Sequence, residues 1–374
     1  MKKILFMSQD PGGTNAIIPV ISALGRDYSI TVIAKDNAVS IYRNHGITCI
    51  DVTQLTDDYG VESLKSVLSI FMPDVIITGT SSMDLYERKI WVAARELSIC
   101  SIALLDSWCY YGLRFSDYTF MSIENYCEST KSTYLPDYVF TMDDESMEAL
   151  IREGMPESRI RVVGQPFLQD LRDEYREIDM NTIEKYKQER FGDKEKKIIL
   201  FASDNLSDSF SPDGYTYWGY DEKSIFNTVY DAIMEKCNND DYMILIRPHP
   251  KEKIDKWEGL INQHHSDRIP LRIDDSSTEK MSIMVADLII GMWSMVLIEG
   301  VLAHKRVLSV QIGAKRKPDF VLEDRGVLSP IYEKKALYET FDLFFSGDMG
   351  VGMAHWDVGN DATKRITSII SEVV

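Results

Sequence analysis

"ILIRPHP", residues 244–250, places an apolar run directly against Arg247, two prolines and His249. The run is continuous rather than alternating, which is typical of a strand covered on both faces of a parallel sheet. Pro248 and Pro250 cannot continue a helix or pair within a sheet, so they hold His249 on a stiff, extended tip. Because ligands of open α/β sheets bind at the carboxyl ends of strands, this tip predicts a binding site. The alternative is a proline-rich connector in which the histidine bonds only to a neighbour.

Similar apolar runs recur along the 374-residue chain, with amphipathic stretches between them. This alternation predicts an α/β protein built from doubly wound parallel sheets, and the length suits two domains. The predicted strands are residues 3–7, 29–34, 74–78, 100–105, 137–142, 160–164, 197–203, 242–247, 287–291 and 306–311.

The chain turns polar and helical in period after the sixth of these strands, which is typical of an exposed connector. We therefore expect an N-terminal domain over 1–165, a connecting helix or linker over 166–196, and a C-terminal domain over 197–350. Residues 351–374 include an amphipathic helix that we expect to pack back on the N-terminal domain.

The composition restricts the classes of partner. A net charge of −18 disfavours nucleic acid and anionic membranes. An odd number of scattered cysteines, in no CxxC pair, indicates neither a disulfide framework nor a zinc site and fits a reducing cytoplasm. The apolar stretch near the N-terminus is too short for a signal peptide, and no segment approaches the length of a membrane span. The cysteines are Cys49, Cys100, Cys109, Cys127 and Cys237.

The first predicted strand is followed by "SQDPGGTN", residues 8–15. Asp10 stands at the carboxyl end of the strand, where a carboxylate can act as a base. Gly12 and Gly13 can expose backbone N–H groups to an anion or let a sugar approach, just before a helix that we expect to begin near Thr14 or Asn15. An ordinary tight turn with one of these two residues as a helix cap is the alternative.

A second acid, Asp106, directly follows the strand at 100–105, and Trp108 lies two residues later. An aromatic ring beside a carboxylate suits a sugar or a base, although such aromatics can also simply cover a domain surface. Thr80, Ser81 and Ser82 follow the preceding strand, where they can cap the next helix or donate to a ligand.

The second half offers a phosphate site. A strand ends at Gly291, and a helix is expected to start near Trp293 or Ser294, so backbone N–H groups near Ser294 and Met295 face any bound anion. Glu299 lies further along this helix among apolar residues and can accept bonds from two ribose hydroxyls. Its alternative is a structural pair with His304 or Lys305. Ser203, at the end of another strand, can touch the same ligand.

The order of these stretches resembles the GT-B superfamily of nucleotide-sugar enzymes. The resemblance rests on the glycine loop after the first strand, "VVGQPF" before the connector, "RPHP", and "GMWSMVLIEG" near the end. It implies two Rossmann-like domains facing a crevice, with the nucleotide donor on the C-terminal domain and the acceptor on the N-terminal one.

Two branches are similar. The UDP-N-acetylglucosamine 2-epimerases have an acid before "GLR", resembling Asp106 and "GLRF", and a "DSGG…EE" stretch that the chain matches at Ser294 and Glu299. The chain lacks the arginine of their first loop and their "HRREN" stretch. The CDP-glycerol glycerophosphotransferases and related capsule and wall-polymer transferases use "RPHP" itself, with the histidine next to the leaving phosphate.

The resemblance implies a cytoplasmic transferase that moves a sugar or polyol phosphate from a nucleotide donor to a glycan or polymer, in bacterial-type surface polysaccharide synthesis. Asp10 or Asp106 would be the base, and His249 with Arg247 would stabilise the leaving phosphate. We expect no cofactor, metal or nucleic acid, and leave a homodimer open. The alternatives are a nucleotide-sugar hydrolase or epimerase and a non-catalytic nucleotide-binding protein.

Overall fold

The computed structural model describes residues 1–126, 132–209, 217–238, 241–264, 268–275, 279–348 and 350–373. The chain divides into two compact units, which are described separately below. Unit 1 comprises Met1–Asp170 and Val358–Val374, and unit 2 comprises Leu171–Asp357.

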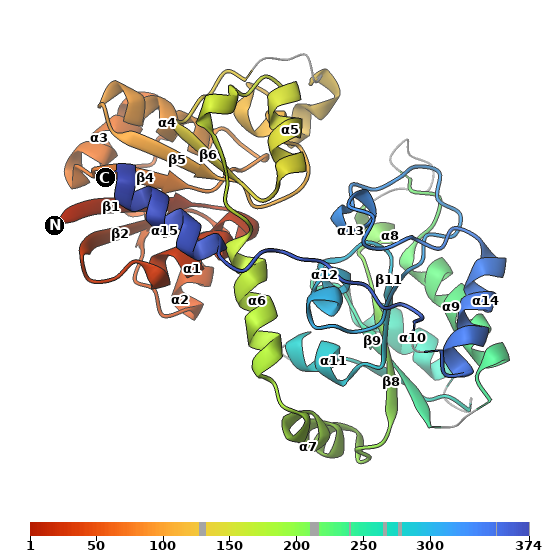
Figure 1. The fold of residues 1–374 in the computed structure, drawn as a ribbon. Helices are drawn as coiled ribbons and strands as arrows, with labels where there is room; N and C mark the ends of the chain where they lie inside the picture. The colour runs from red at the N-terminus through yellow and green to blue at the C-terminus, as the bar shows by residue number, and fades with distance from the viewer. Residues whose placement is uncertain are drawn as a thin grey trace. The chain divides into compact units, whose positions relative to one another are not determined.

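Unit 1 contains a seven-stranded, all-parallel sheet of order β3-β2-β1-β4-β5-β6-β7 (Figure 1). Its central strands are fully buried apolar runs, as expected for a sheet covered on both faces. The strands are β1 Lys2–Ser8, β2 Tyr28–Ala34, β3 Ile50–Asp51, β4 Val75–Thr78, β5 Cys100–Leu104, β6 Tyr138–Thr141 and β7 Ile160–Val162.

Helices cover both faces of this sheet. One face packs against α1 (Pro11–Ala23), α2 (Asn37–Asn44) and α15 (Ala362–Val373), and the other against α3 (Val61–Phe71) and α4 (Tyr86–Glu96). The helix α5 (Asp144–Arg152) lies beside β6 and β7. Short 3-10 turns complete the unit at Val52–Gln54, Gly112–Phe115, Phe120–Asn125 and Glu157–Arg159.

The C-terminal helix α15 is part of the core of unit 1 although it is remote in sequence. Ile366 and Ile370 are fully buried against the residues of α1 and the sheet. Gly164 has a φ of +99°, and a Cβ atom there would lie 2.9 Å from the Cβ of Ala362. A glycine is therefore required where the start of α15 crosses the end of the sheet.

Unit 2 contains a five-stranded parallel sheet of order β10-β9-β8-β11-β12. The strands are β8 Lys197–Ala202, β9 Tyr242–Arg247, β10 Leu271–Ile273, β11 Leu288–Gly291 and β12 Val307–Ser309. The helices of this unit include α9 Glu222–Lys236, α10 Asp255–Gln263, α11 Glu279–Val285, α12 Met295–Leu302 and α14 Lys334–Phe345, with short helices α8 Leu206–Ser209 and α13 Val321–Asp324.

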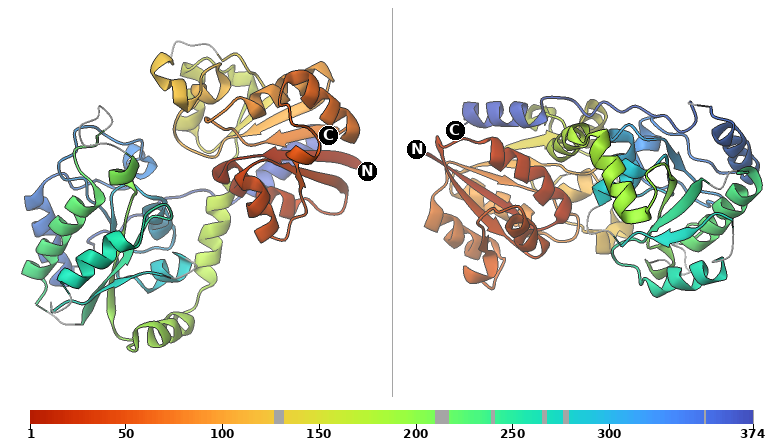
Figure 2. Two further views of the ribbon diagram at one scale, coloured as in Figure 1. Left: turned by 180° about the vertical axis from the view of Figure 1, so that it is seen from behind. Right: turned by 90° about the horizontal axis from the view of Figure 1, so that it is seen from below.

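The sheet of unit 2 also lies between two helical layers, as the views in Figure 2 show. The helices α9, α10 and α14 pack an aromatic-rich core around Phe201, Phe226 and Trp257 on one face. The helices α11 and α12 lie against the other face.

All ten predicted strands are present, and the predicted α/β class with parallel sheets is confirmed. The sequence did not predict β3 and β10, because two or three residues carry no recognisable periodicity. The segment predicted as a connecting helix or linker forms two helices, α6 Pro166–Glu177 and α7 Met180–Phe191. Asp179 caps α7 through a hydrogen bond from the backbone N–H of Thr182, which explains the break.

Among the described helices, none combines the length and the hydrophobicity that crossing a bilayer requires. The described cysteines, Cys49, Cys100, Cys109 and Cys237, are free thiols, and Cys127 lies outside the described residues.

We predict that Ile366→Ala lowers the free energy of unfolding of unit 1 by about 2–5 kcal/mol, because it leaves a cavity in a closed core. Ser368→Ala, on the exposed side of the same helix, should change it by less than about 0.5 kcal/mol. Hydrogen exchange of peptides from β1 and β4 in increasing urea measures the effect in this unit alone. Equal protection of these peptides in the two variants would show that α15 does not stabilise the sheet.

Candidate functional site

The carboxylate of Asp106 lies at the carboxyl end of β5 and is held by groups from several other segments. One oxygen accepts hydrogen bonds from Arg114 Nη1 at 3.1 Å and from the Thr80 hydroxyl at 3.4 Å. The backbone carbonyl of Asp106 accepts a bond from Gln165 Nε2 at 3.0 Å. The side chains of Asp106 and Arg114 are only 12% and 7% exposed, so the pair is a fixed, largely buried ion pair.

The helix α1 begins earlier than the sequence predicted. It starts at Pro11 with Asp10 as the N-cap residue, so Gly12 and Gly13 lie in its first turn, and the predicted start at Thr14 or Asn15 is wrong. Proline favours the first helical position because its fixed φ suits a helix and it needs no N–H partner there.

The two glycines of this first turn allow close packing. A Cβ atom on Gly12 would lie 2.0 Å from Oδ2 of Asp106, and one on Gly13 would lie 3.1 Å from Cα of Gly79. Thr14 is buried and bonds to the Asp10 carbonyl at 2.7 Å and to Ser8 Oγ at 2.9 Å. Asn15 lies one position further along α1 and is partly buried.

The carboxylate of Asp10 lies close enough to Asp106 and Arg114 to interact with their charges. It makes no side-chain cap for α1, and its side chain bonds to Ser81 instead. Burial raises the pKa of Asp10, and the neighbouring charge of Asp106 raises it further. A raised pKa lets the Asp10 carboxylate bind a proton more readily, which is a property that a general base needs.

Glu87 was not predicted from the sequence. It lies buried in the first turn of α4, where an acid ordinarily indicates only a favourable interaction with the helix dipole. Its carboxylate accepts a hydrogen bond from the backbone N–H of Ser81. Burial raises the pKa of Glu87 to about 8, and the charges of Asp10 and Asp106 act in the same direction. Glu87 therefore carries a proton at neutral pH.

Trp108 is anchored within unit 1. Its Nε1–H donates to Asp143 Oδ2 at 2.7 Å, and its ring packs beside a core cluster that includes Phe115 and Leu150. The contact ties the loop after β5 to the N-terminus of α5. Thr80, Ser81 and Ser82, for which the sequence left helix capping or donation to a ligand open, do not cap the next helix, since Leu85 is the N-cap residue of α4.

In unit 2 the carboxyl ends of β9, β8 and β11 are joined by hydrogen bonds. Ser203, buried after β8, donates its backbone N–H to the carbonyl of Arg247 at 2.9 Å. The carboxylate of Asp204 accepts a bond from the backbone N–H of Trp293 at 3.3 Å. Burial raises the pKa of Asp204 to about 7. These bonds place the predicted residues Ser203, Arg247 and Ser294 on one edge of the sheet.

Arg247 and His249 are both positioned by acids that the sequence did not single out. Arg247 Nη1 pairs with Asp274 Oδ2 at 2.6 Å, and the carboxylate is almost fully buried. Glu252 accepts a bond from the backbone N–H of His249 at 2.7 Å. The backbone N–H of Lys251 donates to His249 Nδ1 at 3.2 Å, so Nδ1 acts as an acceptor and the proton of the neutral ring lies on Nε2.

Ser294 is the N-cap residue of α12, so the helix begins close to the predicted position, and Met295 is the first residue of the helix. The Ser294 hydroxyl does not cap the helix and makes no hydrogen bond to any of the described residues, although it is buried. A buried hydroxyl at the start of a helix, with the first N–H groups beside it, is suited to bind an anion.

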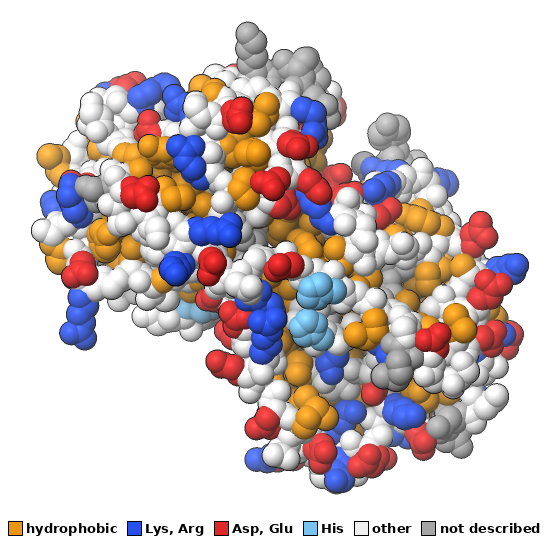
Figure 3. All heavy atoms as spheres, in the orientation of Figure 1, with side chains coloured by type: hydrophobic (Ala, Val, Ile, Leu, Met, Phe, Trp, Pro, Cys, Tyr) orange, Lys and Arg blue, Asp and Glu red, His pale blue; other side chains and the backbone are white. Residues whose placement is uncertain are grey.

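Glu299 has a partner other than those proposed for it. Its carboxylate accepts a hydrogen bond from the Tyr175 hydroxyl of α6 at 2.5 Å. Lys305, one of the partners proposed for Glu299, donates from Nζ to the Met284 carbonyl at 2.5 Å. The His304 ring stacks on that of His355 with centroids 6.1 Å apart, and Figure 3 shows two histidine side chains side by side on the surface.

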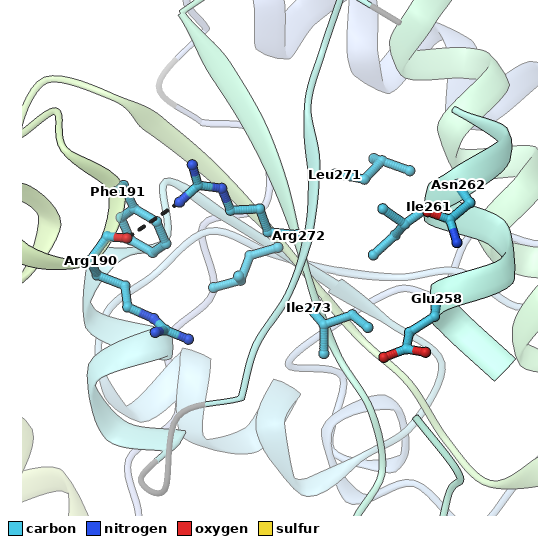
Figure 4. Close-up of a pocket in the computed structure, with 9 residues that line it drawn as sticks. Arg190, Phe191, Glu258, Ile261, Asn262, Leu271, Arg272 and Ile273 are labelled. Carbon is cyan, nitrogen blue, oxygen red and sulfur yellow. Dashed lines mark hydrogen bonds between the residues drawn. The ribbon is translucent and has the colours of Figure 1, made fainter. Parts of the chain in front are cut away.

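A pocket of about 470 Å³ lies along the outer edge of β10 and contains none of the predicted site residues (Figure 4). Arg272 donates to the carbonyl of Arg190 at 3.3 Å, and Arg190 forms an ion pair with Asp275. These basic groups therefore hold the end of α7 to the sheet edge. In the described part of the chain, no group of three or more potential metal ligands is found.

The fold matches solved structures over nearly the whole chain. UDP-GlcNAc 2-epimerase from Methanocaldococcus jannaschii is 16% identical, with 99% of each chain covered and a TM-score of 0.71. The enzyme from Neisseria meningitidis bound to UDP-GlcNAc is 14% identical, with 99% of this chain and 100% of that chain covered and a TM-score of 0.69. A structure of the wall teichoic acid polymerase TagF is 13% identical, with coverage of 99% and 89% and a TM-score of 0.53.

The protein has the GT-B fold. The resemblance inferred from the sequence is confirmed at the level of the fold. No protein-family model matches the chain, and neither does any curated protein sequence.

We predict that Gly12→Ala destabilises unit 1 by about 1–3 kcal/mol, the usual cost of overpacking, because its methyl group would displace the Asp106 carboxylate. In an Asp106→Ala background the same change should cost much less, since the clash is gone. Gly25→Ala is the control, because no atom lies within 4 Å of a Cβ there. Chemical denaturation of all variants gives the coupling energy, and a value near zero would contradict the packing.

We predict that protonation of His249 destabilises unit 2. Burial, assisted by Lys251, lowers the pKa of His249 below its ordinary value, so the unfolded chain binds the proton more readily. The contribution of neutral His249 to the stability of unit 2 is complete above about pH 6.5, the pKa of histidine in the unfolded chain. It is lost as the pH falls from that value towards the lower pKa of the folded state. The stability advantage of the parent over His249→Gln should therefore shrink between about pH 8 and about pH 5. A difference independent of pH would refute this.

Proposed function

We propose that the protein is a GT-B transferase that moves a sugar or polyol phosphate from a nucleotide-activated donor to a hydroxyl of a glycan or polymer. The observation that carries the proposal is the buried Ser294 hydroxyl, which has no partner among the described residues and lies at the N-terminus of α12. It shares a sheet edge with Arg247 and with the tip that bears His249. Such an edge suits the phosphates of a nucleotide.

The phosphates of the nucleotide substrate would be bound by neutral and cationic hydrogen-bond donors of unit 2. The first N–H groups of α12 and the Ser294 hydroxyl would donate hydrogen bonds to the phosphate oxygens without reorganisation. The Nε2–H of His249 would donate to the leaving phosphate, and Arg247, fixed by Asp274, would add positive charge. We propose that this set requires no cofactor beyond the activated substrate.

The acceptor hydroxyl would be deprotonated by a carboxylate of unit 1. Between the two candidates, we propose Asp10 as the base, because burial raises its pKa towards neutrality. Asp106 is held by Arg114 and Thr80, and its role in this proposal is to position the first turn of α1.

The second candidate function is hydrolysis or epimerisation of a nucleotide sugar. The observation that favours it is the fold, because the 2-epimerases from the two organisms above match with TM-scores of 0.71 and 0.69. Incubation with UDP-N-acetylglucosamine and no acceptor separates the candidates. Release of UDP or formation of the 2-epimer without an acceptor would support this second function and contradict the transferase.

We predict that the melting temperature of the parent rises with at least one member of a panel of UDP, CDP, CMP and GDP compounds, since a ligand at 100 times its Kd adds about 2.7 kcal/mol. Ser294→Ala should weaken that binding by about 0.5–1.5 kcal/mol, the usual value of one hydrogen bond.

The matched control is Ser346→Ala, at the C-terminal end of α14, whose hydroxyl bonds to the carbonyl of Leu343 in the same helix. It should leave nucleotide binding unchanged. Absence of a shift in the parent with every nucleotide would refute the donor site, whereas equal binding by Ser294→Ala would move the phosphate away from α12.

A further inference from the structure

Unit 2 has a second cavity, of about 560 Å³, whose lining is rich in lysine. It lies among α8, the start of α9 and the loop that connects β9 to α10. The lining residues are Ser207, Lys223, Lys251, Lys253, Asp255 and Lys256. None of the residues assigned above to the nucleotide site lines it.

Lys256 forms the inner wall of this cavity and is fixed by buried acids. Its ammonium group donates to Glu252 at 2.6 Å and to the Ser207 hydroxyl at 3.0 Å, and it also pairs with Glu222. The side chains of Glu222 and Glu252 are fully buried. Lys256 is therefore structural and ties α10 to the starts of α8 and α9.

The remaining three lysines differ from Lys256. Lys223, Lys251 and Lys253 are exposed, and none forms an ion pair with another residue in the described part of the chain. Elsewhere on unit 2, exposed lysines such as Lys317 and Lys335 lie within 4 Å of a carboxylate. In a chain with a net charge of −18, three lysines lie around one cavity, and Asp255 is the only acid among the described residues of its lining. This local excess of positive charge favours an anionic ligand.

The side-chain chemistry indicates the class of anion. Lysine ammonium groups are point charges with rotatable donors, which bind phosphate oxygens from several directions, and the described lining contains four of them. Three such groups around an open cavity of this size suit a ligand with several phosphates. The Ser207 hydroxyl adds a polar group at the inner wall.

We propose that this lysine cavity is a second anion site, distinct from the nucleotide site, that binds phosphate groups of a polyanionic ligand. The phosphates can come from a phosphate-containing polymer or from a free phosphorylated metabolite. The site is contiguous with the His249 tip, because Lys251 and Lys253 belong to the same loop and the N–H of Lys251 donates to the His249 ring.

The test is calorimetric titration of the full chain with inorganic tripolyphosphate. In Lys223→Gln/Lys253→Gln the affinity should fall by about tenfold, which corresponds to 1.4 kcal/mol. The control Lys334→Gln/Lys335→Gln removes the same charge from exposed positions on α14 and should keep the parent affinity. Lys251 and Lys256 are left unchanged because they contact the His249 tip and the buried acids.

Two results would overturn the proposal: no binding of tripolyphosphate by the parent, or equal losses in the cavity and control variants. Nucleotide binding distinguishes this site from the donor site, since the cavity variant should retain it. Loss of both ligands together would mean that there is only one site. Stronger binding of long-chain polyphosphate than of tripolyphosphate would identify a polymer as the source, and equal binding would identify a free metabolite.

Discussion

The buried ion pair between Asp106 and Arg114 is the interaction on which the functional edge of unit 1 depends. Segments that follow four strands meet at Asp106. The first turn of α1, the loop after β4 and Arg114 after β5 contact its carboxylate, and the residue before α6 bonds to its backbone carbonyl. A charge in such a place requires a partner, because removing either member leaves the other buried and uncompensated. The ion pair therefore fixes the loops that carry the candidate catalytic groups.

The sequence predicted the long strands well, because continuous apolar runs report burial on both faces. It also placed Asp10 and Asp106 correctly at strand ends. The start of α1 was misplaced because the two glycines suggested a turn, whereas Asp106 and Gly79 require them for close packing inside the helix. Local sequence does not contain that information, since the contacts come from strands far along the chain.

The partners of the predicted residues escaped prediction for the same reason. Asp274 holds Arg247 across 27 positions, and Tyr175 reaches Glu299 across 124. Glu87 has no sequence signal beyond an acid at a helix start, and only its burial beside Asp10 and Asp106 separates it from an ordinary surface residue. Strand topology gives the location of a site, while the protonation and orientation of its groups depend on such distant contacts.

The two edges differ in the charge that they offer to a substrate. Unit 1 gathers Asp10, Glu87 and Asp106, and two buried arginines, Arg114 and Arg88, lie beside them. Because Glu87 is protonated, this edge offers carboxylate and carboxyl oxygens that suit hydroxyl groups. Unit 2 offers the N-terminus of α12, the Ser294 hydroxyl, which has no partner among the described residues, and the Nε2–H of His249. The acids Asp274, Glu252 and Asp204 of this edge are engaged with Arg247, Lys256 and a backbone N–H group. In the proposed function, the edge of unit 1 would receive the acceptor and the edge of unit 2 the phosphorylated donor.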